Sequence, residues 1–329
     1  MGKRALVTGV TGQDGMYLAE LLQKKGYEVY GLIRGQFNPK RKIMEAEFPF
    51  VKLIDGDLTD LGSLVRALEI AQPEEVYNLG AISFVKYSFD QPNITADVTG
   101  KGVLNILEAI RIVKGEKTIR FYQASTSEMF GGTAYNRPKA GYTEDSTFHP
   151  KSPYGVAKLY AHWITKNYRE SYGIHASTGI LFNHESPRRG LEFVTRKVTN
   201  SVAKIKLGKQ KHITLGNLDP KRDWGFAGDY VRGMWLMVQQ DEPGDYVLGS
   251  GSTHSIEELL KVAFKAVDID DWKPYIKQDP QFMRPAEVDV LLGDPTKAKE
   301  KLGWVPEVSF EQLIQMMVEN DLRLESENK

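Results

Sequence analysis

Short apolar runs alternate with longer segments of helical pattern along the first half of the chain. The runs show little alternation of apolar and polar positions, as expected for parallel strands that helices cover on both faces. They predict strands at Ala5–Thr8, Glu28–Ile33, Phe50–Asp55, Glu75–Leu79, Arg120–Ala124 and His175–Leu181. The segments between them predict helices at Gln13–Lys25, Ser63–Ala71, Asp97–Arg111 and Tyr154–Tyr172. Strands that alternate with helices form βαβ units, so the predicted fold class is α/β with a doubly wound parallel sheet.

The pattern weakens after Leu181, which predicts a second and smaller part of the protein. Segments Asn183–Gly190 and Gly216–Gly228 are rich in glycine, proline and charge, and they are predicted as loops. A helix at Asp229–Gln240 and a strand at Tyr246–Gly249 are predicted to return to the main sheet.

Helices at Ile256–Val267 and Phe310–Leu322 are predicted to build a smaller C-terminal lobe. We therefore expect a sheet domain from residues 1–182, with about 226–250 returning to it. The lobe would comprise about 183–225 together with 251–329.

Composition excludes several classes of function. The chain of 329 residues carries 43 Lys+Arg and 43 Asp+Glu, and this balance argues against a nucleic-acid or polybasic membrane binder. It has no cysteine, which excludes disulfides, thiolate metal sites and a thiol nucleophile, and no metal is predicted. The basic run Lys204–His212 is interpreted as a solvated helix end and turn.

Targeting signals are also not expected. No apolar run reaches the roughly 18–20 residues that a membrane span needs. The N-terminal apolar run is too short for a signal peptide and is interpreted as the first strand, so a cytoplasmic protein is expected.

Glycines spaced as G-x-x-G-x-x-G follow the first predicted strand and open the first predicted helix. Gly9 permits the tight turn, Gly12 allows backbone to approach a pyrophosphate, and Gly15 allows the helix to pack closely on the sheet. The N-terminus of that helix would face the phosphates. This context predicts a Rossmann-type dinucleotide site built from Gly9, Thr11, Gly12, Gln13, Asp14 and Gly15.

The end of the second strand indicates which cofactor binds. NAD sites place an acid there for the ribose hydroxyls, whereas this chain has Arg34, which can pair with the extra phosphate of NADP. The alternative is an arginine that only covers the sheet edge. Asp57 is expected at the adenine amino group. The other residues expected along the cofactor are Leu58, Leu79, Gly80, Ala81 and Ser83.

A tyrosine and a lysine four residues apart supply candidate redox chemistry. Tyr154 and Lys158 share one helix face, and the run 125–127 (Ser-Thr-Ser) precedes them after the fifth strand. Oxidation of a carbinol needs a base for the hydroxyl proton, so the tyrosine pKa must fall from about 10 toward neutrality. A nearby ammonium and an oxidised nicotinamide would lower it. Outside this fold context such a pair is commonly an ordinary surface pair.

Together these motifs resemble the extended short-chain dehydrogenases/reductases and, in more detail, the GDP-mannose 4,6-dehydratases. That closer resemblance covers nearly the whole chain. It rests on residues 8–15 (TGVTGQDG), 76–81 (VYNLGA), 121–128 (FYQASTSE), 152–158 (SPYGVAK), 183–190 (NHESPRRG), 222–225 (RDWG) and 282–288 (FMRPAEV).

The resemblance implies a dehydration in which Tyr154 and Lys158 oxidise C4 of a hexose and the Thr126–Glu128 pair completes the reaction. A 4-keto group acidifies the C5 hydrogen, so Glu128 can remove it while the C6 hydroxyl leaves. An alternative for Glu128 is a charge that complements a helix N-terminus.

The resemblance also implies a GDP-sugar substrate, NADP as cofactor and a homodimer or homotetramer. His184 and Arg189 would lie near the cofactor. Whether they also lie near the cofactor of a neighbouring subunit stays open. Lys197, Arg222, Arg284 and Glu287 would bind the nucleotide diphosphate and guanine. The other expected substrate contacts are Ser83, Thr126, Glu128 and Asn183.

The chain departs from the family pattern in two places. The loop after the second strand often has two arginines followed by serines, whereas this chain has Arg34-Gly35-Gln36-Phe37, which leaves the contacts of the 2′-phosphate open. The segment 249–281 is shorter than in many members of the family, so the lobe around the sugar is expected to differ from theirs.

Several alternative functions stay open from the sequence alone. They are a GDP-heptose dehydratase, an epimerase or reductase on the same scaffold, and a non-catalytic NADP-binding protein. Glu128 disfavours a simple 4-epimerase, and the Tyr154–Lys158 pair disfavours a non-catalytic protein.

Overall fold

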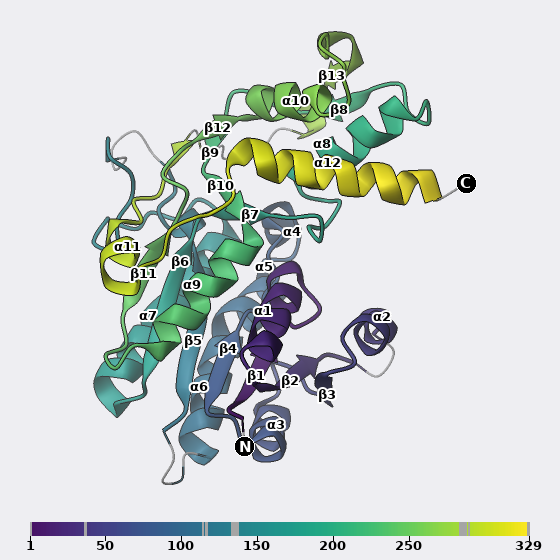
Figure 1. Ribbon diagram of the computed structural model, residues 1–329. Coiled ribbons are helices and arrows are strands. Elements are labelled where there is room, and N and C mark those ends of the chain that lie inside the picture. The colour runs from purple at the N-terminus through teal and green to yellow at the C-terminus, as the bar shows by residue number, and fades with distance from the viewer. Residues whose placement is uncertain are drawn as a thin grey trace.

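A parallel sheet forms the centre of the protein. The computed structural model describes residues 2–35, 38–113, 115, 118–132, 138–282, 288 and 290–327. Within them, seven parallel strands pair in the order β11-β6-β5-β4-β1-β2-β3 (Figure 1). They are β1 (Arg4–Thr8), β2 (Glu28–Ile33), β3 (Val51–Asp55), β4 (Glu75–Asn78), β5 (Arg120–Thr126), β6 (Ala176–Leu181) and β11 (Asp245–Leu248).

Helices cover both faces of this sheet. Helices α1 (Gln13–Lys24) and α9 (Ala227–Gln239) pack on one face, where Leu18, Leu22 and Met234 are fully buried. The other face carries α3 (Leu61–Ala71), α6 (Gly102–Val113) and α7 (Pro153–Tyr172). Both faces bury apolar side chains of the strands, which explains why the strand sequences lack alternation. The predicted Rossmann-type fold class is therefore confirmed.

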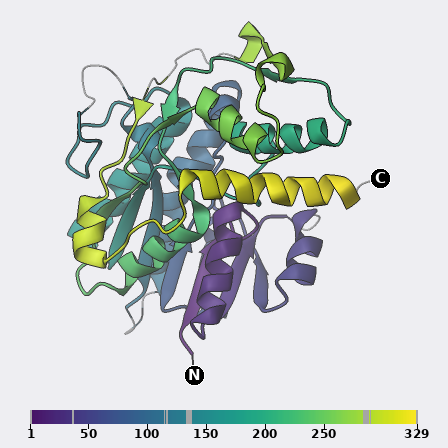
Figure 2. The same cartoon turned by 45° about the horizontal axis from the view of Figure 1, so that its top comes forward.

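A smaller lobe lies over the carboxyl ends of the strands. Its core joins α8 (Val194–Lys206), α10 (Ile256–Lys265) and α12 (Phe310–Glu327) around buried Leu260, Phe264 and Met317. Figures 1 and 2 both show α12, in yellow, running along the boundary between this lobe and the sheet domain. The remaining helical segments are α2 (Lys40–Glu47), α4 (Val85–Asp90), α5 (Pro92–Thr95), η1 (Ala96–Lys101), η2 (Ser127–Met129), η3 (Lys273–Tyr275), η4 (Pro280–Phe282) and α11 (Thr296–Leu302).

The two segments predicted as loops contain short strands, so that prediction was wrong in part. Strand β7 (Asn183–Glu185) pairs with β10 (Trp224–Phe226), and β9 (Lys221–Arg222) pairs with β12 (His254–Ser255) and β14 (Val290–Leu291). The last pair joins β8 (Ile213–Leu215) to β13 (Ile276–Gln278). Strands of two or three residues are too short to show a period of two in the sequence.

Helices α2 and α8 are the longest of those that the sequence analysis missed, and polar residues outnumber apolar ones in both. Helix α2 buries only Met44, and α8 buries polar side chains such as Arg196, Thr199 and Asn200 beside its valines. The other long helices and all seven sheet strands lie within three residues of their predicted bounds, with two exceptions. The helix predicted at Asp97–Arg111 begins as the π-helical η1, and α12 continues five residues beyond its predicted end at Leu322. The strand predicted to return after Asp229–Gln240 is β11, which pairs with β6.

No helix in the described part of the chain combines the length and apolar character that a membrane crossing requires.

The close contact between α1 and the turn before it gives a stability prediction. A Cβ on Gly15 would lie 2.4 Å from the carbonyl oxygen of Gly9 and 2.6 Å from Cα of Val10. Backbone cannot give way as a flexible side chain can, so we expect Gly15→Ala to lower the free energy of unfolding by about 1–3 kcal/mol. Chemical denaturation measures this change.

The matched control is Gly62→Ala in α3, where the new Cβ would meet only the Asp60 side chain, at 3.4 Å. Alanine favours a helix over glycine, so this variant should be as stable as the parent or slightly more stable. Equal stability of the two variants would contradict the proposed tight contact.

Candidate active site

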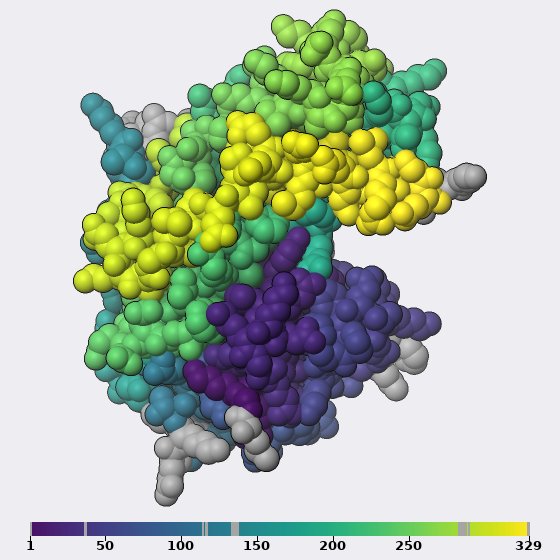
Figure 3. All heavy atoms as spheres, in the orientation of Figure 1, coloured from purple at the N-terminus to yellow at the C-terminus, as the bar shows by residue number. Residues whose placement is uncertain are grey.

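A cavity of about 1060 Å³ lies between the carboxyl ends of the central strands and the lobe. The sheet order reverses on either side of β1, and this is where open α/β sheets bind ligands. The space-filling view shows the surface hollowed between α12 and the N-terminal part of the chain (Figure 3). The predicted site residues that line the cavity are Gly9, Thr11, Gly12, Gln13, Asp14, Gly15, Leu79, Gly80, Ala81, Ser83, Thr126, Glu128, Tyr154, Lys158, Asn183, His184, Arg189, Lys197 and Arg222.

Three of the predicted site residues that the structure describes are not among those that line the cavity. They are Arg34, Asp57 and Leu58. The Arg34 side chain is 65% exposed, and its Nε is 4.0 Å from a carboxylate oxygen of Asp57. Arg284 and Glu287 lie outside the described residues.

The glycine-rich turn lines the cavity at the carboxyl end of β1. Gly9 has a φ of +66°, a conformation that favours glycine, and its carbonyl accepts from the Gly12 amide at 2.9 Å. Side chains tie this turn to its neighbours, because Thr8 Oγ1 accepts from the Gly80 amide at 3.0 Å. Thr8 also donates to Asn78 at 2.6 Å, so the ends of β1 and β4 are held in register.

The Tyr154–Lys158 pair lies in the first turns of α7. The hydroxyl of Ser152 caps this helix by accepting from the Gly155 amide at 3.0 Å. Lys158 is buried, its Nζ donates to the Ala124 carbonyl at 2.7 Å, and it lies 5.9 Å from the centre of the Tyr154 ring. The ammonium is thereby held beside the tyrosine at the end of β5.

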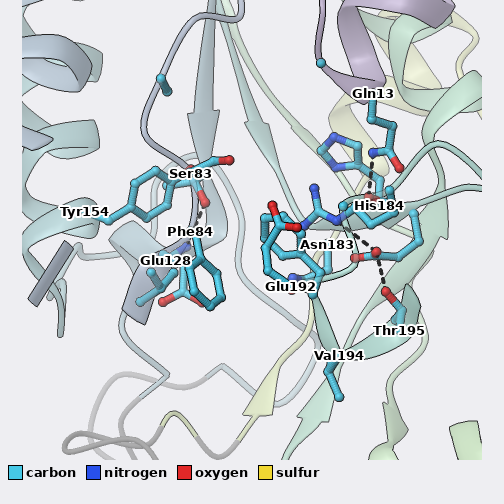
Figure 4. A pocket seen from close by; sticks show the side chains of 18 of the residues that line it. Gln13, Ser83, Phe84, Glu128, Tyr154, Asn183, His184, Glu192, Val194 and Thr195 are labelled. Atoms are coloured by element: carbon cyan, nitrogen blue, oxygen red, sulfur yellow. Dashed lines mark hydrogen bonds and ion pairs between the residues drawn. The ribbon is translucent and has the colours of Figure 1, made fainter. Parts of the chain in front are cut away.

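Thr126 and Glu128 face the same space from the segment after β5. Thr126 Oγ1 accepts from the Glu128 amide at 3.3 Å, which starts η2 and turns the chain. In Figure 4, Ser83, Phe84, Glu128 and Tyr154 lie on one side of the cavity, and Asn183, Glu192 and His184 lie on the other. The four predicted catalytic side chains therefore converge, and each is less than one-tenth exposed.

The pKa directions in this cluster differ from the simple expectation. Burial raises the pKa of Tyr154, against the lowering effect of the Thr126 hydrogen bond. Burial also lowers the pKa of Lys158 to about 8. The protein environment alone thus moves the tyrosine away from neutrality, because desolvation disfavours the charged phenolate.

His184 connects the glycine-rich turn to the lobe. Its Nε2 lies 2.8 Å from an Asp14 carboxylate oxygen, and its Nδ1 donates to the Phe182 carbonyl at 2.7 Å. Burial opposes the charged imidazolium, but the charge and hydrogen bond of Asp14 together with the hydrogen bond to Phe182 outweigh it, so the pKa of His184 is raised. Burial likewise opposes ionisation of Asp14, but the charge of His184 and the hydrogen bonds from His184 and Gln13 together hold the Asp14 pKa below its usual value. Gln13 reinforces the link by donating to the His184 carbonyl at 3.0 Å.

Arg189 is held in the cavity by Glu185 and Phe193. Its Nε is 3.0 Å from Glu185, which also accepts from Thr195 at 2.5 Å. The guanidinium lies 3.5 Å from the centre of the Phe193 ring, and that ring contacts Phe84 edge to face at 5.7 Å. The Phe84–Phe193 contact therefore joins the sheet domain to the lobe at the cavity.

The lobe side of the cavity carries three of the predicted substrate residues, Lys197, Asn183 and Arg222. Lys197 donates to the Thr214 carbonyl at 2.7 Å, and burial together with the nearby charge of Lys86 lowers its pKa. The Asn183 side-chain oxygen is buried and accepts no hydrogen bond from the described residues. Arg222 is buried and donates to the Val288 carbonyl at 2.6 Å, so its side chain also anchors the lobe.

Several residues that line the cavity were missed by the sequence analysis. They come from α2, from the start of α4 with the residue before it, and from residues 185–195, where only Glu185 and Arg188 lie inside the recognised run 183–190. They are Lys40, Phe84, Lys86, Glu185, Arg188, Glu192, Phe193 and Thr195. No group of three or more potential metal ligands occurs among the described residues.

The fold and this set of side chains define an extended short-chain dehydrogenase/reductase. Solved structures with the same fold include UDP-glucose 4-epimerase from Thermotoga maritima, with a TM-score of 0.83, 25% identity and 99% of both chains covered. RMD from Pseudomonas aeruginosa, complexed with NADPH, has a TM-score of 0.80 and 22% identity over 98% of this chain and 100% of that chain. The dTDP-glucose 4,6-dehydratase DesIV from Streptomyces venezuelae has a TM-score of 0.82 and 21% identity over 96% of each chain. At these identities the last two show the fold alone.

Within this class the chain belongs to the GDP-mannose 4,6 dehydratase family, whose model matches residues 6–317. It is 50% identical to GDP-mannose 4,6 dehydratase 2 of Arabidopsis thaliana over 99% of this chain and 89% of the relative. It is 48% identical to the human GDP-mannose 4,6 dehydratase, over 97% of this chain and 91% of the relative. The family resemblance drawn from the motifs is confirmed.

The Asp14–His184 pair predicts a pH-dependent contribution to stability. Because the folded-state pKa of Asp14 is lowered, its contribution is present above about pH 4 and is lost in more acidic solution. Because that of His184 is raised, its contribution is present below about pH 6.5 and is lost as pH rises through the folded value. Asp14→Asn should therefore lower the melting temperature most between about pH 4 and 6.5, and progressively less above that range.

Melting curves across the pH range check this prediction. The matched control is Glu69→Gln, an exposed acid on α3, which should give a small difference that does not vary with pH. A constant Asp14→Asn difference from pH 4 to 9 would show that the pair is not ionised in the folded protein.

Proposed function

We propose that this protein catalyses the NADP-dependent dehydration of GDP-mannose to GDP-4-keto-6-deoxymannose. The observation that carries the proposal is the convergence of Thr126, Glu128, Tyr154 and Lys158 on the cavity beside the glycine-rich turn. The similarity to named GDP-mannose 4,6 dehydratases over nearly the whole chain supports the sugar and the reaction. It also favours this reaction over the heptose, epimerase and non-catalytic alternatives.

The residues at the glycine-rich turn fit a nicotinamide dinucleotide. Gly9 allows the turn to pack against the segment after β4, since a Cβ on Gly9 would lie 2.8 Å from the Gly80 amide nitrogen. Gly12 and the N-terminus of α1 would hold the pyrophosphate. The cofactor, when bound, supplies the hydride acceptor at C4 and returns the hydride to C6. Structural neighbours carry NADPH in one case and NAD in others, and the lack of an acid at the end of β2 favours NADP here.

The residues of the chain itself perform the proton transfers. Tyr154 would take the C4 hydroxyl proton, with Thr126 hydrogen-bonded to the reacting oxygen and the Lys158 ammonium stabilising the phenolate. The positive charge of a bound oxidised nicotinamide would oppose the effect of burial on the Tyr154 pKa. Glu128, two residues after Thr126, would then remove the C5 proton and assist departure of the C6 hydroxyl as water.

The lobe would bind the rest of the substrate. The Asn183 oxygen, which accepts no hydrogen bond within the described part of the chain, suits a sugar hydroxyl, since a buried acceptor gains most from a new donor. Lys197 and Lys86 lie on different elements of the same cavity and would be neutralised by the diphosphate between them. Arg222 would contribute from the edge of β9. Arg284 and Glu287 keep their expected roles at the phosphate and guanine as part of this proposal.

The proposal includes the division into a cofactor domain and a substrate lobe, with residues 1–182 and about 226–250 in the former. It places the reaction in the cytoplasm, where NADP and nucleotide sugars are free small molecules.

Variants of the two proton-transfer residues test the proposed reaction. In Glu128→Gln, Tyr154 and Lys158 remain, so C4 oxidation should proceed while elimination stalls, and reduced cofactor should accumulate at the site. Tyr154→Phe should leave both cofactor and substrate unchanged. The measurements are absorbance of the reduced nicotinamide and mass spectrometry of the sugar nucleotide, over a panel that includes GDP-mannose and a GDP-heptose.

Label transfer separates this reaction from a plain oxidation. GDP-mannose deuterated at C4 should give a product with deuterium at C6, without net NADPH from the unmodified protein. Normal turnover of Glu128→Gln, or loss of the label to free cofactor, would leave an ordinary oxidoreductase as the better description.

We further propose that the protein is a homo-oligomer that associates through α7. Val156, Tyr160 and Trp163 are 55%, 44% and 50% exposed, and their spacing places them on one face of that helix. Exposed apolar side chains gathered on one helix face are typical of an interface. The same helix carries Tyr154 and Lys158, so association would stabilise the helix that holds the catalytic pair.

A charge in this stripe should disrupt the assembly. Trp163→Glu is expected to shift the protein toward a monomer in light scattering coupled to size-exclusion chromatography. Ile70→Glu, at an isolated residue on α3 that is 53% exposed, is the matched control and should leave the mass unchanged. A monomeric parent protein, or an unchanged mass of Trp163→Glu, would refute the α7 interface.

A further inference from the structure

We infer that Lys40, at the start of α2, is the residue that binds the 2′-phosphate of NADP and so sets the preference for NADP over NAD. The inference rests on the proposed NADP-dependent function and names a residue for its cofactor specificity. It starts from the chain's departure at Arg34-Gly35-Gln36-Phe37, which lacks a second arginine.

The position of the Lys40 ammonium carries the argument. Its Nζ donates to the carbonyl of Thr11 at 3.2 Å, and Thr11 lies between Gly9 and Gly12 in the glycine-rich turn. Lys40 lines the cavity together with this turn, although it comes from the helix after β2. The chain thus places a flexible cation across the gap between the turn and the segment that follows β2.

This gap is where the adenosine ribose of a dinucleotide lies in a Rossmann-type fold. The turn after the first strand holds the pyrophosphate, and residues at the end of the second strand contact the ribose hydroxyls. A phosphate on the 2′-oxygen would therefore project between the turn and α2. An ammonium that already reaches the Thr11 carbonyl needs little movement to meet it.

Neighbouring cations are engaged elsewhere. Arg41 pairs with Asp55 and lies 3.8 Å from Glu45, and Arg188 lies 2.6 Å from Glu20. Arg34 lies 4.0 Å from Asp57 and is not among the residues that line the cavity. Within the described residues Lys40 contacts a carbonyl but no carboxylate, so its charge remains available to an anion. An ammonium has three donors and can keep the carbonyl while it binds phosphate.

Binding measurements on purified protein test the inference without using catalysis. We would titrate NADP and NAD separately by isothermal calorimetry into the parent protein, Lys40→Met, Lys40→Arg and Arg34→Met. The control is Lys42→Met, a neighbouring exposed lysine on the same helix. Thermal melting of each variant without nucleotide confirms that the fold is kept.

Lys40→Met should weaken NADP binding about tenfold or more, as expected when a charge-assisted hydrogen bond is lost, and should change NAD binding less than twofold. Lys40→Arg should keep the preference for NADP, and Lys42→Met should match the parent. The NADP advantage of the parent should shrink with added salt more than that of Lys40→Met.

The outcomes separate the inference from the proposed function. If the parent protein does not prefer NADP, the proposed cofactor itself is wrong. If the parent prefers NADP and Lys40→Met keeps that preference, the assignment to Lys40 is overturned, and loss in Arg34→Met would give the role to Arg34. Equal weakening of NADP and NAD in Lys40→Met would also overturn it, because Lys40 would then only support the turn.

Discussion

The parallel direction of the seven strands is the constraint on which the rest of this protein depends. Because every strand ends at the same edge and the order reverses around β1, the segments after β1, β4, β5 and β6 are forced to meet there. The glycine-rich turn, Gly80, Glu128 and Asn183 come from those four segments. Close packing at Gly15 lets α1 start directly above the edge, which leaves its N-terminus open to the cavity. Catalytic and binding residues placed just after these strands therefore converge on the cavity.

The cavity exists because the lobe is fastened to that edge by buried polar contacts rather than by apolar packing alone. Asp14 and Gln13 from α1 hold His184 of β7, and Phe84 meets Phe193 before α8. Farther along, Arg196 of α8 pairs with Asp321 of α12 at 2.6 Å and donates to the Arg189 carbonyl at 3.1 Å. The C-terminal helix thus supports the loop that carries Arg189. Buried pairs of this kind are costly to break from one side, so they favour a single arrangement of lobe and sheet.

The protein alone does not set the pKa values that the reaction needs at Tyr154 and Lys158. Burial moves the Tyr154 pKa upward and that of Lys158 down to about 8, so neither group alone is poised as a strong base or a fixed charge. A positively charged nicotinamide and an anionic sugar nucleotide would change both environments when they bind. The proposed dehydratase would therefore acquire its reactive proton-transfer state with its ligands, which suits a reaction that must not release a half-oxidised intermediate.

The sequence by itself determined the sheet, its main helices, the glycine-rich turn and the Tyr154–Lys158 pair, because each rests on local periodicity or short spacing. The same local signals predicted that Thr126 and Glu128 would follow β5. Only the tertiary structure decided that Arg34 and Asp57 pair with each other outside the set of lining residues, while Lys40 of the unforeseen helix α2 reaches the turn at Thr11. It also decided the contacts of His184 with Asp14 and of Arg196 with Asp321, residues 170 and 125 positions apart. Such contacts depend on how whole elements pack, and a strand of three residues or a helix with one buried side chain leaves no periodic trace in the sequence.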